Sequence, residues 1–390
     1  MSLDIAIAHK DYDTRGGGEV FVRRLANHLD CPVWVGRRNQ DNEPPDGGLE
    51  IREIPLSAGE RWAIDRGGVT RAAAYMSAWS KASSVLAQYD VVITSGNEPM
   101  WYVAPDEQVH IAYTHSTPRF MYDLFPDRTS AMSTLGAAFN IGKRTLYQHN
   151  TPRPDLWIAN SDRVARRITR YHHVSTDDVR VVYPPVDVHN YSADLVGTSD
   201  FYLHVGRLAG HKRVDDIVEA WQYIDTPLKI AGAGPDRDRL ERMAPSHVEF
   251  LGFVSEHRKR ELMSAAKAHV YAPENEDFGM VPIESMAAGT PVIGVNEGFT
   301  KYQVRDGANG ILFDRGEQNM IAAIQRFERD GVAWTAAELE RFATQFGVDR
   351  FREQIDAAID RGVAAAQVEP QVAFEMGETP AVTDGGDADV

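Results

Sequence analysis

Short apolar runs alternate with amphipathic segments along most of the chain, and this alternation begins again after residue 200. The first set of predicted strands is Leu3–Ala8, Val33–Gly36, Val91–Ser95, His110–His115, Leu156–Asn160 and Val179–Tyr183. The second set is Phe201–Gly206, Leu228–Ala231, Val248–Leu251, Ala268–Ala272, Pro291–Val295 and Gly310–Phe313. Strands that alternate with helices form parallel sheets. The pattern therefore predicts an α/β protein with two similar halves that face each other.

The chain of 390 residues exceeds what one hydrophobic core usually supports, which favours two domains. We predict an N-terminal domain over 1–186, a polar, proline-containing linker over 187–199 and a C-terminal domain over 200–346. We also predict a C-terminal helix over 347–366, for which one option is that it packs back on the N-terminal domain. The acidic tail over 367–390 is expected to lack fixed structure. In the first half, predicted helices cover Val20–Leu29, Arg71–Gln88, Ser130–Gln148 and Val164–Tyr171. Because such halves bind ligands where their strands end, a cleft between them is the expected site.

Composition excludes several classes of function. The net charge of −16 argues against a nucleic-acid partner, and most of the acidic excess lies after residue 190. Two interpretations of that excess remain open, a protein of a high-salt cytoplasm and an ordinary acidic protein. The single cysteine, Cys31, excludes an internal disulfide and a cysteine-built zinc site. The first residues lack the features of a signal peptide, and no apolar run is long enough to span a membrane, so we expect a cytoplasmic protein.

Three turns that follow predicted strands have the residues of a phosphate site. Gly16, Gly17 and Gly18 open the first helix, where glycine lets the backbone approach a ligand and the helix terminus favours an anion. Arg207 and Lys212 follow the strand that ends at Gly206, and two cations there can bind a diphosphate. A further turn contains Gly232 and Gly234. For both glycine turns, a plain tight turn is the alternative, and for the cations it is a solvated surface.

The segment "ENEDFGMVPIESMAAGTPVIG", residues 274–294, contains two glutamates eight positions apart at the junction of a loop and a helix. Pro282 suits the first position of that helix, which would place Glu284 in its first turn. A carboxylate there can accept hydrogen bonds from the two hydroxyls of a ribose, and Glu276 would face the phosphate side. The alternatives are helix capping by Glu284 and simple solvation of Glu276. His115 ends a strand on the cleft side, so a role in the site competes with an ordinary local hydrogen bond.

Together these motifs resemble the retaining glycosyltransferases of family 4, which have the two-domain GT-B fold. Glu276 and Glu284 with "ESMAAGTPVI" look like the two-glutamate motif of that family. The likeness continues in "GGGE", "VGRL" with Lys212, "AGAGP", and "IANSDRVARRI" followed by "VVYPPVD", and it covers residues 3 to 365. The stretch "HSTPRFMYDLF" further resembles bacterial mannosyltransferases of surface-polysaccharide assembly, which points to GDP-mannose as donor.

The resemblance implies a role for each matching residue. Arg207, Lys212, Gly17 and Gly18 would bind the donor diphosphate, and Glu284 the ribose. Glu276 would bind hydroxyls of the transferred sugar, and the backbone of Phe278, Gly279 and Met280 would lie against the sugar and phosphates. Glu276 and His115 would be the catalytic residues, and Gly232 and Gly234 would form a turn on the nucleotide side. Arg213 directly follows Lys212, a departure from the pattern that could share or blur the role of Lys212.

The implied reaction is transfer of a hexose from a nucleotide-diphosphate sugar to a hydroxyl of a glycan or lipid-linked saccharide, with retention of configuration. The resemblance also implies two Rossmann-like domains, of which the first binds the acceptor. The reaction would need neither a metal nor a cofactor. The pathway would be assembly of a cell-surface polysaccharide or of a glycoprotein glycan. Two alternatives share the architecture: a non-hydrolysing sugar-nucleotide 2-epimerase and a nucleotide-sugar-binding protein without turnover. Basic and aromatic stretches of the first half could associate peripherally with a membrane. The alternative is that the aromatic residues belong to the core and the basic residues form a solvated face.

Overall fold

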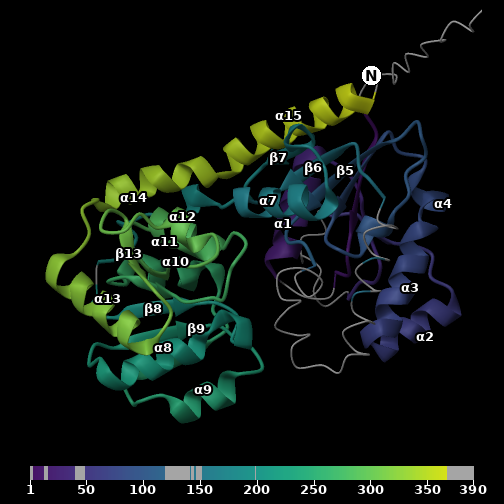
Figure 1. Ribbon diagram of the computed structural model, residues 1–390. Coiled ribbons are helices and arrows are strands. Elements are labelled where there is room, and N and C mark those ends of the chain that lie inside the picture. The colour runs from purple at the N-terminus through teal and green to yellow at the C-terminus, as the bar shows by residue number, and fades with distance from the viewer. Residues whose placement is uncertain are drawn as a thin grey trace, which may run out of the picture.

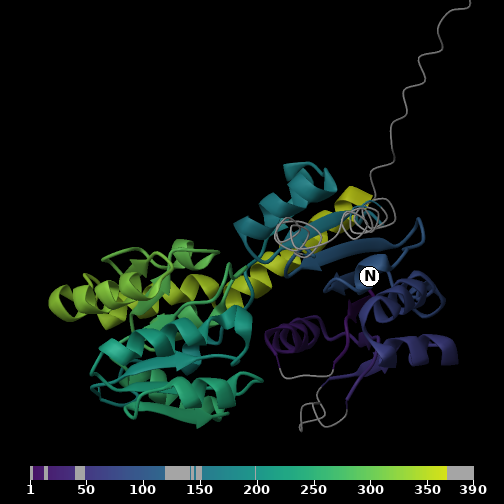
Figure 2. The same ribbon diagram turned by 60° about the horizontal axis from the view of Figure 1, so that its bottom comes forward.

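The computed structural model describes residues 3–12, 16–39, 49–118, 152–197 and 199–366, together with Ile141 and Thr145. The helix predicted over Ser130–Gln148 lies almost entirely outside these residues, as do the aromatic stretch at 120–125 and the tail over 367–390. The described residues form two lobes, each built on one parallel sheet (Figure 1), and the lobes remain separate in the view of Figure 2. The predicted α/β class with two parallel-sheet domains is therefore confirmed.

The N-terminal domain contains a seven-stranded sheet in the order β3-β2-β1-β4-β5-β6-β7. Its strands are β1 (Ile5–His9), β2 (Val33–Val35), β3 (Ile51–Glu53), β4 (Val91–Ser95), β5 (Val109–Thr114), β6 (Leu156–Ala159) and β7 (Val179–Val181). Its helices are α1 (Gly17–Leu29), α2 (Ala58–Arg66), α3 (Gly68–Ser80), α4 (Ser83–Leu86) and α7 (Asp162–His172), with 3-10 turns η2 (Pro99–Trp101) and η4 (Thr176–Asp178). Alternate residues of β1 point to opposite faces: Ile7 packs with α1, whereas Ala6 and Ala8 pack with α2 and α3.

The C-terminal domain contains a six-stranded sheet in the order β10-β9-β8-β11-β12-β13. Its strands are β8 (Tyr202–Val205), β9 (Leu228–Ala231), β10 (Val248–Gly252), β11 (His269–Tyr271), β12 (Val292–Val295) and β13 (Gly310–Phe313). Its helices are α8 (Val214–Ala220), α9 (Arg237–Met243), α10 (Glu256–Ala265), α11 (Met280–Ala287), α12 (Thr300–Gln303), α13 (Glu317–Asp330) and α14 (Ala336–Ala343). The 3-10 turns are η5 (Val188–Asn190), η6 (Gly210–Lys212), η7 (Trp221–Tyr223) and η8 (Thr344–Phe346). Helices cover both faces of the sheet, as its continuous apolar strands require.

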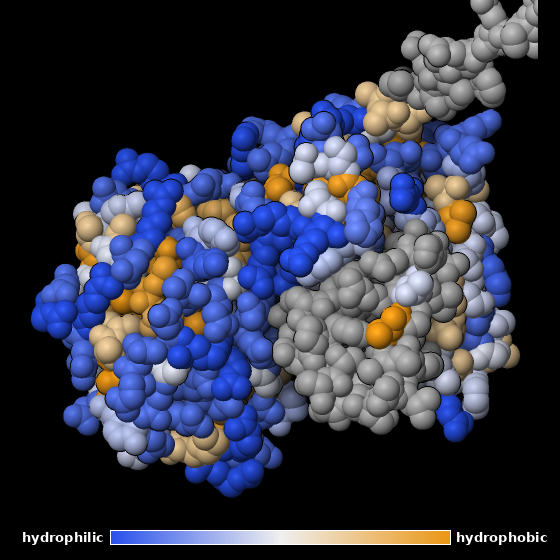
Figure 3. Space-filling model, viewed as in Figure 1, coloured by the Kyte–Doolittle hydropathy of each residue, from blue (hydrophilic) through white to orange (hydrophobic). Residues whose placement is uncertain are grey.

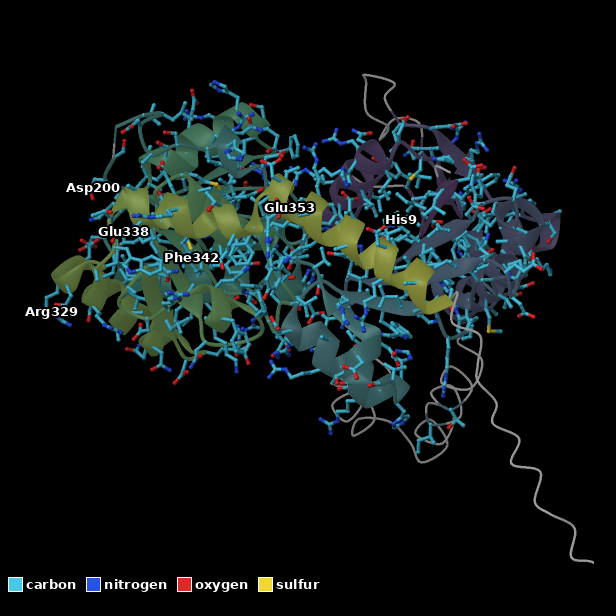
Figure 4. The ribbon with its side chains drawn as sticks, turned by 90° about the horizontal axis from the view of Figure 1, so that it is seen from above. His9, Asp200, Arg329, Glu338, Phe342 and Glu353 are labelled. Atoms are coloured by element: carbon cyan, nitrogen blue, oxygen red, sulfur yellow. The ribbon has the colours of Figure 1, made fainter. Side chains whose placement is uncertain are left out.

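The chain crosses between the domains twice, and the two crossings lie side by side. The Val186 amide donates to the Phe346 carbonyl at 2.9 Å. After the first crossing, Val188 and Tyr191 are buried in the core of the C-terminal domain, so this part of the predicted linker packs on that domain. After the second, α15 (Val348–Ala366) returns to the N-terminal domain, where Phe351, Ile355, Ala358 and Ile359 join the core beside α1. Figure 4 shows α15 running between the lobes, with Glu353 on it, Phe342 in one lobe and His9 in the other.

Three local predictions differ from the structure. The strand β3 was not predicted, because Ile51-Arg52-Glu53 contains one apolar residue and is too short to show alternation. The single helix predicted over Arg71–Gln88 is instead α3 and α4, separated at Lys81 and Ala82. No helix was predicted over α2.

The surface of the described residues offers no membrane-spanning element. Among these residues, no helix is both long and apolar enough to cross a bilayer. On the face drawn in Figure 3, the surface of the C-terminal domain is mostly hydrophilic.

Candidate functional site

A cleft of about 760 Å³ lies between the two domains, at the edges of the sheets where the strands end. In each sheet the strand order reverses there, between β1 and β4 in one domain and between β8 and β11 in the other. Loops that leave neighbouring strands in opposite directions open a crevice at such a point, and ligands bind in it. Ten of the residues predicted for the site line this cleft: Gly16, Gly17, His115, Arg207, Lys212, Gly232, Glu276, Phe278, Gly279 and Met280.

The loop after β8 carries the two predicted cations, and the glycine turn after β9 supports it. A Cβ atom on Gly232 would lie 1.8 Å from the Gly206 carbonyl oxygen, and one on Gly234 would lie 2.1 Å from the Leu208 oxygen. These two positions therefore need glycine so that the backbones can touch. Gly232 lines the cleft, whereas Gly234 does not; its role is to pack against the loop that carries Arg207.

Lys212 and Glu276 lie close together across the cleft floor. The Lys212 ammonium forms an ion pair with Glu276 Oε2, which also accepts a hydrogen bond from the Tyr271 hydroxyl at 3.3 Å. Burial raises the pKa of Tyr271 well above its usual range, and Glu276 raises it further, so the phenol remains a donor. Arg207 is exposed and forms no ion pair with any residue the structure describes. Of the two predicted cations, Lys212 is thus paired with a carboxylate and Arg207 is not.

The helix that carries Glu284 begins earlier than predicted. Its N-cap is Gly279, with φ of 78°, and α11 starts at Met280, so Pro282 is its third residue and Glu284 lies in its second turn. A Cβ atom on Gly279 would lie 2.6 Å from the Tyr271 hydroxyl oxygen, so the turn needs glycine for space as well as for its backbone angle. The prediction that Glu284 interacts with the helix terminus from the first turn was wrong.

Glu284 lies behind the cleft rather than in its lining. Its Oε1 atom is 3.1 Å from the Lys259 ammonium, and Lys259 lines the cleft. Burial alone would lower the pKa of Lys259, but the charges of Glu284 and Glu256 raise it, so this lysine stays cationic. The pKa of Tyr191 is raised by burial and by the charge of Glu284. Glu284 is therefore held by a buried network, and a ribose would have to share it with Lys259.

Across the cleft, the glycine loop brings the N-terminal domain close to α11. A Cβ atom on Gly17 would lie 3.1 Å from Cε of Met280, and a Cβ on Gly18 would approach only His9 and Lys10. Gly18 does not line the cleft. Gly16 is the N-cap of α1, and its amide donates to Glu19 Oε2 at 3.1 Å. The described part of the glycine loop therefore reaches the site through Gly16 and Gly17.

His115 is part of a neutral hydrogen-bond chain. Its Nε2 lies 2.9 Å from Ser95 Oγ, which lies 3.2 Å from Nδ1 of His9. The pKa of both imidazoles is lowered to about 3. Burial is the main cause, and a neighbouring cationic group lowers each pKa further. At neutral pH His115 is uncharged, so it can exchange hydrogen bonds but does not supply a positive charge.

Several lining residues were not predicted from the sequence, among them Lys259, Tyr271, Asn160 and Phe253. Phe253 follows β10 directly and is 78% exposed, which places an unshielded ring at the cleft. Its position after a strand of the second set was the signal that could have identified it. No group of three or more potential metal ligands is found among the residues the structure describes. A second pocket, of about 480 Å³, lies at the hinge beside α7, α12 and η8 and contains none of the predicted residues.

Comparison with sequence families finds two matches. The family described as Glycosyltransferase Family 4 matches residues 15–190, and the family described as Glycosyl transferases group 1 matches residues 192–345. The boundary between the two matches lies close to the first crossing between the domains.

Individual relatives differ in how much of the chain they match. The human alpha-1,3/1,6-mannosyltransferase ALG2 is 25% identical over 398 residues, which cover 87% of this chain and 92% of that protein. A GDP-mannose-dependent alpha-(1-6)-phosphatidylinositol dimannoside mannosyltransferase of Mycobacterium tuberculosis is 36% identical over 103 residues, 25% of this chain and 27% of the relative. An uncharacterized glycosyltransferase of Methanocaldococcus jannaschii is 33% identical over 127 residues, 32% of this chain. The chain spans 36% of that relative's length and 50% of a second one from the same organism.

Solved structures share the whole fold at low sequence identity. The sucrose-phosphate synthase of Thermosynechococcus elongatus superposes with a TM-score of 0.70 at 19% identity, covering 92% of this chain and 99% of that one. The Anabaena protein HepE, solved with UDP and glucose, gives a TM-score of 0.69 at 17% identity, with the same shares covered.

Proposed function

Because the chain belongs to the glycosyltransferases of family 4, we propose that it transfers a hexose from a nucleotide-diphosphate sugar to a hydroxyl group of a saccharide, with retention of anomeric configuration. The observation that carries this proposal is the convergence of Arg207, Lys212, Glu276 and the glycine loop on one interdomain cleft. A diphosphate and a sugar require a cationic and a hydroxyl-binding side, and the cleft has both.

In the proposed reaction the bond between the sugar C1 and the diphosphate oxygen breaks, and a bond from C1 to the acceptor oxygen forms on the same face. The acceptor proton passes to the leaving phosphate. The charge that develops on the diphosphate is stabilised by Arg207 and by Lys212, which Glu276 already holds before the donor arrives. Glu276 orients sugar hydroxyls. The neutral His115 hydrogen-bonds near C1 and needs no change of protonation.

The nucleotide end of the donor would lie along the second domain. Phe253 presents a ring on which a base can stack, and Lys259 and Glu284 lie on the adjacent side. Mannose from GDP-mannose is the first donor to test, because relatives that match this chain are named as mannosyltransferases and one as GDP-mannose-dependent. A glycan or a lipid-linked saccharide, in assembly of a surface polysaccharide or a glycoprotein glycan, is the proposed acceptor.

A donor screen tests this function directly. Thermal unfolding is measured with GDP, UDP, GDP-mannose, UDP-glucose and UDP-N-acetylglucosamine, since a ligand that binds the folded protein raises its stability by RT ln(1 + [L]/Kd). The stabilising donor is then incubated with the protein alone and with a panel of saccharide acceptors. We expect a nucleotide-specific shift, slow donor hydrolysis without acceptor, and a product whose anomeric configuration by NMR equals that of the donor. Conversion of UDP-N-acetylglucosamine to its 2-epimer, or binding without any turnover, would contradict the proposal.

A further inference from the structure

The loop that carries Glu276 belongs to the C-terminal domain, but the N-terminal domain holds it from both sides of that residue. Arg163 Nη2 donates to Asn275 Oδ1 at 3.0 Å, and Arg167 Nη1 lies 2.5 Å from Asp277 Oδ1. The Ser161 hydroxyl donates to the Asp277 carbonyl oxygen at 2.6 Å. All three donors belong to α7 or to its N-cap, whereas all three acceptors belong to the two neighbours of Glu276 in the chain.

Asp277 forms two ion pairs with α7, one with Arg163 Nε at 3.6 Å and a closer one with Arg167 that is buried. Asp277 is 9% exposed and Arg167 is 7% exposed. A buried charge is stable only when it has a partner, so separation of the two domains must return both groups to water. The pair therefore exists only in the arrangement in which the domains touch, and loss of one partner there leaves the other charge buried without its closest partner.

The C-terminal domain holds the same loop from its other side, through Lys212 and Tyr271 on the Glu276 side chain and through contacts to the loop backbone. The Phe299 amide donates to the Glu276 carbonyl oxygen at 2.8 Å, and a Cβ atom on Gly298 would lie 2.5 Å from that oxygen. Asn275 has φ of 50°, an unusual angle for a residue other than glycine. The side chains of Asn275 and Asp277 thus bond to the opposite domain, whereas Glu297 of the C-terminal domain accepts from the Asn275 backbone.

The segment that holds this loop also reaches His115. Asn160 Nδ2 donates to the His115 carbonyl oxygen at 2.8 Å, and Asn160 directly precedes Ser161. Two consecutive residues at the start of α7 therefore bond to both sides of the cleft. Asn160 binds His115 of the first domain, and Ser161 binds the Glu276 loop of the second. Ser161 also caps α7 by accepting from the Val164 amide at 3.3 Å, so the stretch is anchored to a helix.

We propose that Arg167, Asp277 and Ser161 form an interdomain clasp, and that they are positioning residues which align Glu276 with His115 only while the domains are in contact. The clasp couples closure of the cleft to assembly of the site. Its effect on turnover rests on the proposed glycosyl transfer, whereas its effect on the loop itself does not.

The test compares Arg167→Met, Asp277→Asn and the double variant with the unaltered protein. Arg170→Ala is the matched control, because Arg170 is an exposed cation on the last turn of the same helix. Arg167→Lys keeps the charge. Two readouts are taken: hydrogen exchange of the amides of residues 274–280, and donor affinity separated from kcat.

We expect each single variant to speed exchange of these amides by at least about tenfold, because the close pair of Arg167 and Asp277 is broken and only the longer contact with Arg163 is left to Asp277 in Arg167→Met. We expect kcat to fall about 100-fold, since misplacement of a catalytic group by about 1 Å has that effect, while the donor Kd changes less than about threefold. The double variant should lose no more than Asp277→Asn, because Arg167 acts on the loop through Asp277. Arg167→Lys should recover part of kcat, and Arg170→Ala should match the unaltered protein.

Unchanged exchange and unchanged kcat in Arg167→Met and Asp277→Asn would overturn the clasp. So would losses that simply add in the double variant, or a fall in kcat that is matched by global unfolding in the exchange data. If the unaltered protein turns over no donor, the transferase proposal fails, but the exchange of residues 274–280 still decides whether the clasp exists.

Discussion

The two domains share one topology and place their loops at the same kind of point, yet they bring opposite chemistry to the cleft. The N-terminal domain contributes His9, Ser95 and His115, which are neutral and hydrogen-bonded to one another. The C-terminal domain contributes Arg207, Lys212 with Glu276, and Lys259 with Glu284, which are charged and mostly paired. A parallel sheet of this kind supplies a location, and the residues on its loops decide what binds there.

The difference assigns a task to each side. Charges that must oppose a diphosphate lie on the domain proposed to hold the donor. In the proposed reaction, the groups that face the reacting carbon and the acceptor are uncharged, so they can exchange hydrogen bonds without joining the ion pairs on the other side of the cleft. Substitutions on the two sides should therefore fail in different ways, and four experiments test that expectation.

The largest effect is expected on the charged side. Arg207→Ala removes the cation that has no carboxylate partner among the described residues, and we expect kcat/KM to fall about 1000-fold, the loss typical of one donor to a developing anion. Lys212→Ala should lower kcat/KM by a similar factor, and it should also leave Glu276 without its ion pair. Steady-state kinetics with the donor found in the screen provide the measurement. Arg329→Ala is the control, since its side chain is 67% exposed and, among the described residues, pairs with Asp330 next to it. Near-normal turnover of Arg207→Ala would remove the phosphate assignment.

A neutral residue should show a smaller loss and no pH signature. For His115→Gln we expect about a 100-fold fall in kcat, in the lower range for a positioned polar group. Because the pKa of His115 is lowered to about 3, its protonation does not change between pH 5 and 8. The pH profiles of the unaltered enzyme and of His115→Gln should therefore be parallel. A limb near pH 6.5 that disappears in the variant would show that His115 titrates, against the comparison drawn above.

The next effect should be confined to binding. Phe253→Ala should raise the donor Kd about tenfold, because stacking of a base on an aromatic ring contributes about 1–3 kcal/mol, and kcat should stay unchanged. Phe253→Trp keeps a ring and should bind normally. Tyr223→Ala, which removes an exposed ring of η7, is the control. Calorimetric titration with the free nucleotide gives the Kd. Equal affinity in Phe253→Ala and the unaltered protein would place the base elsewhere.

The smallest effect concerns stability rather than turnover. Burial lowers the pKa of His9 to about 3, of His110 and His204 to about 4, and of His269 well below its usual value. The unfolded chain then binds more protons than the folded one below about pH 6.5, so stability must fall as pH drops from there toward 4. Each such group contributes at most about 1.4 kcal/mol per pH unit.

Urea titrations between pH 7 and 4.5 measure this slope. His110→Gln removes one of the groups at a position away from the cleft, where His110 Nε2 bonds Thr94 Oγ1 at 3.0 Å, and it should lessen the slope by about one proton. A free energy of unfolding that does not change over this range would show that these imidazoles are not held neutral.

Much of the fold followed from the sequence, because most strands are continuous apolar runs that only a covered parallel sheet explains. The residues that were missed had other signals. Ser57 and Glu60 at the start of α2 form a capping box, with the Ser57 amide donating to Glu60 Oε2 at 2.9 Å, and that spacing is legible in the sequence. The start of α11 was misplaced because Pro282 favours a first helical position, whereas Gly279 supplied the turn that decides it.

The site was predictable only in part, for a physical reason. Motifs on loops that follow strands could be assigned to one edge of a sheet, and Arg207, Lys212 and Glu276 do lie together there. The contacts of Asp277 with Ser161 and Arg167 join positions more than 100 residues apart. Nothing local in either segment specifies the partner, because the relative placement of two domains depends on the whole interface. The withdrawal of Glu284 behind Lys259 depends on the same kind of long-range packing.

The return of α15 has a consequence for the order in which the protein is made. The last strand of the first sheet ends at Val181, but Phe351 and Ile355, which cover part of that sheet, are synthesised 170 or more residues later. At about 5–20 residues per second, a ribosome needs roughly 10 to 30 s to bridge that interval. During this time the nascent first domain has an apolar face without its final helix. The first domain therefore cannot complete its core until α15 has been made, and the whole second domain is synthesised before that point.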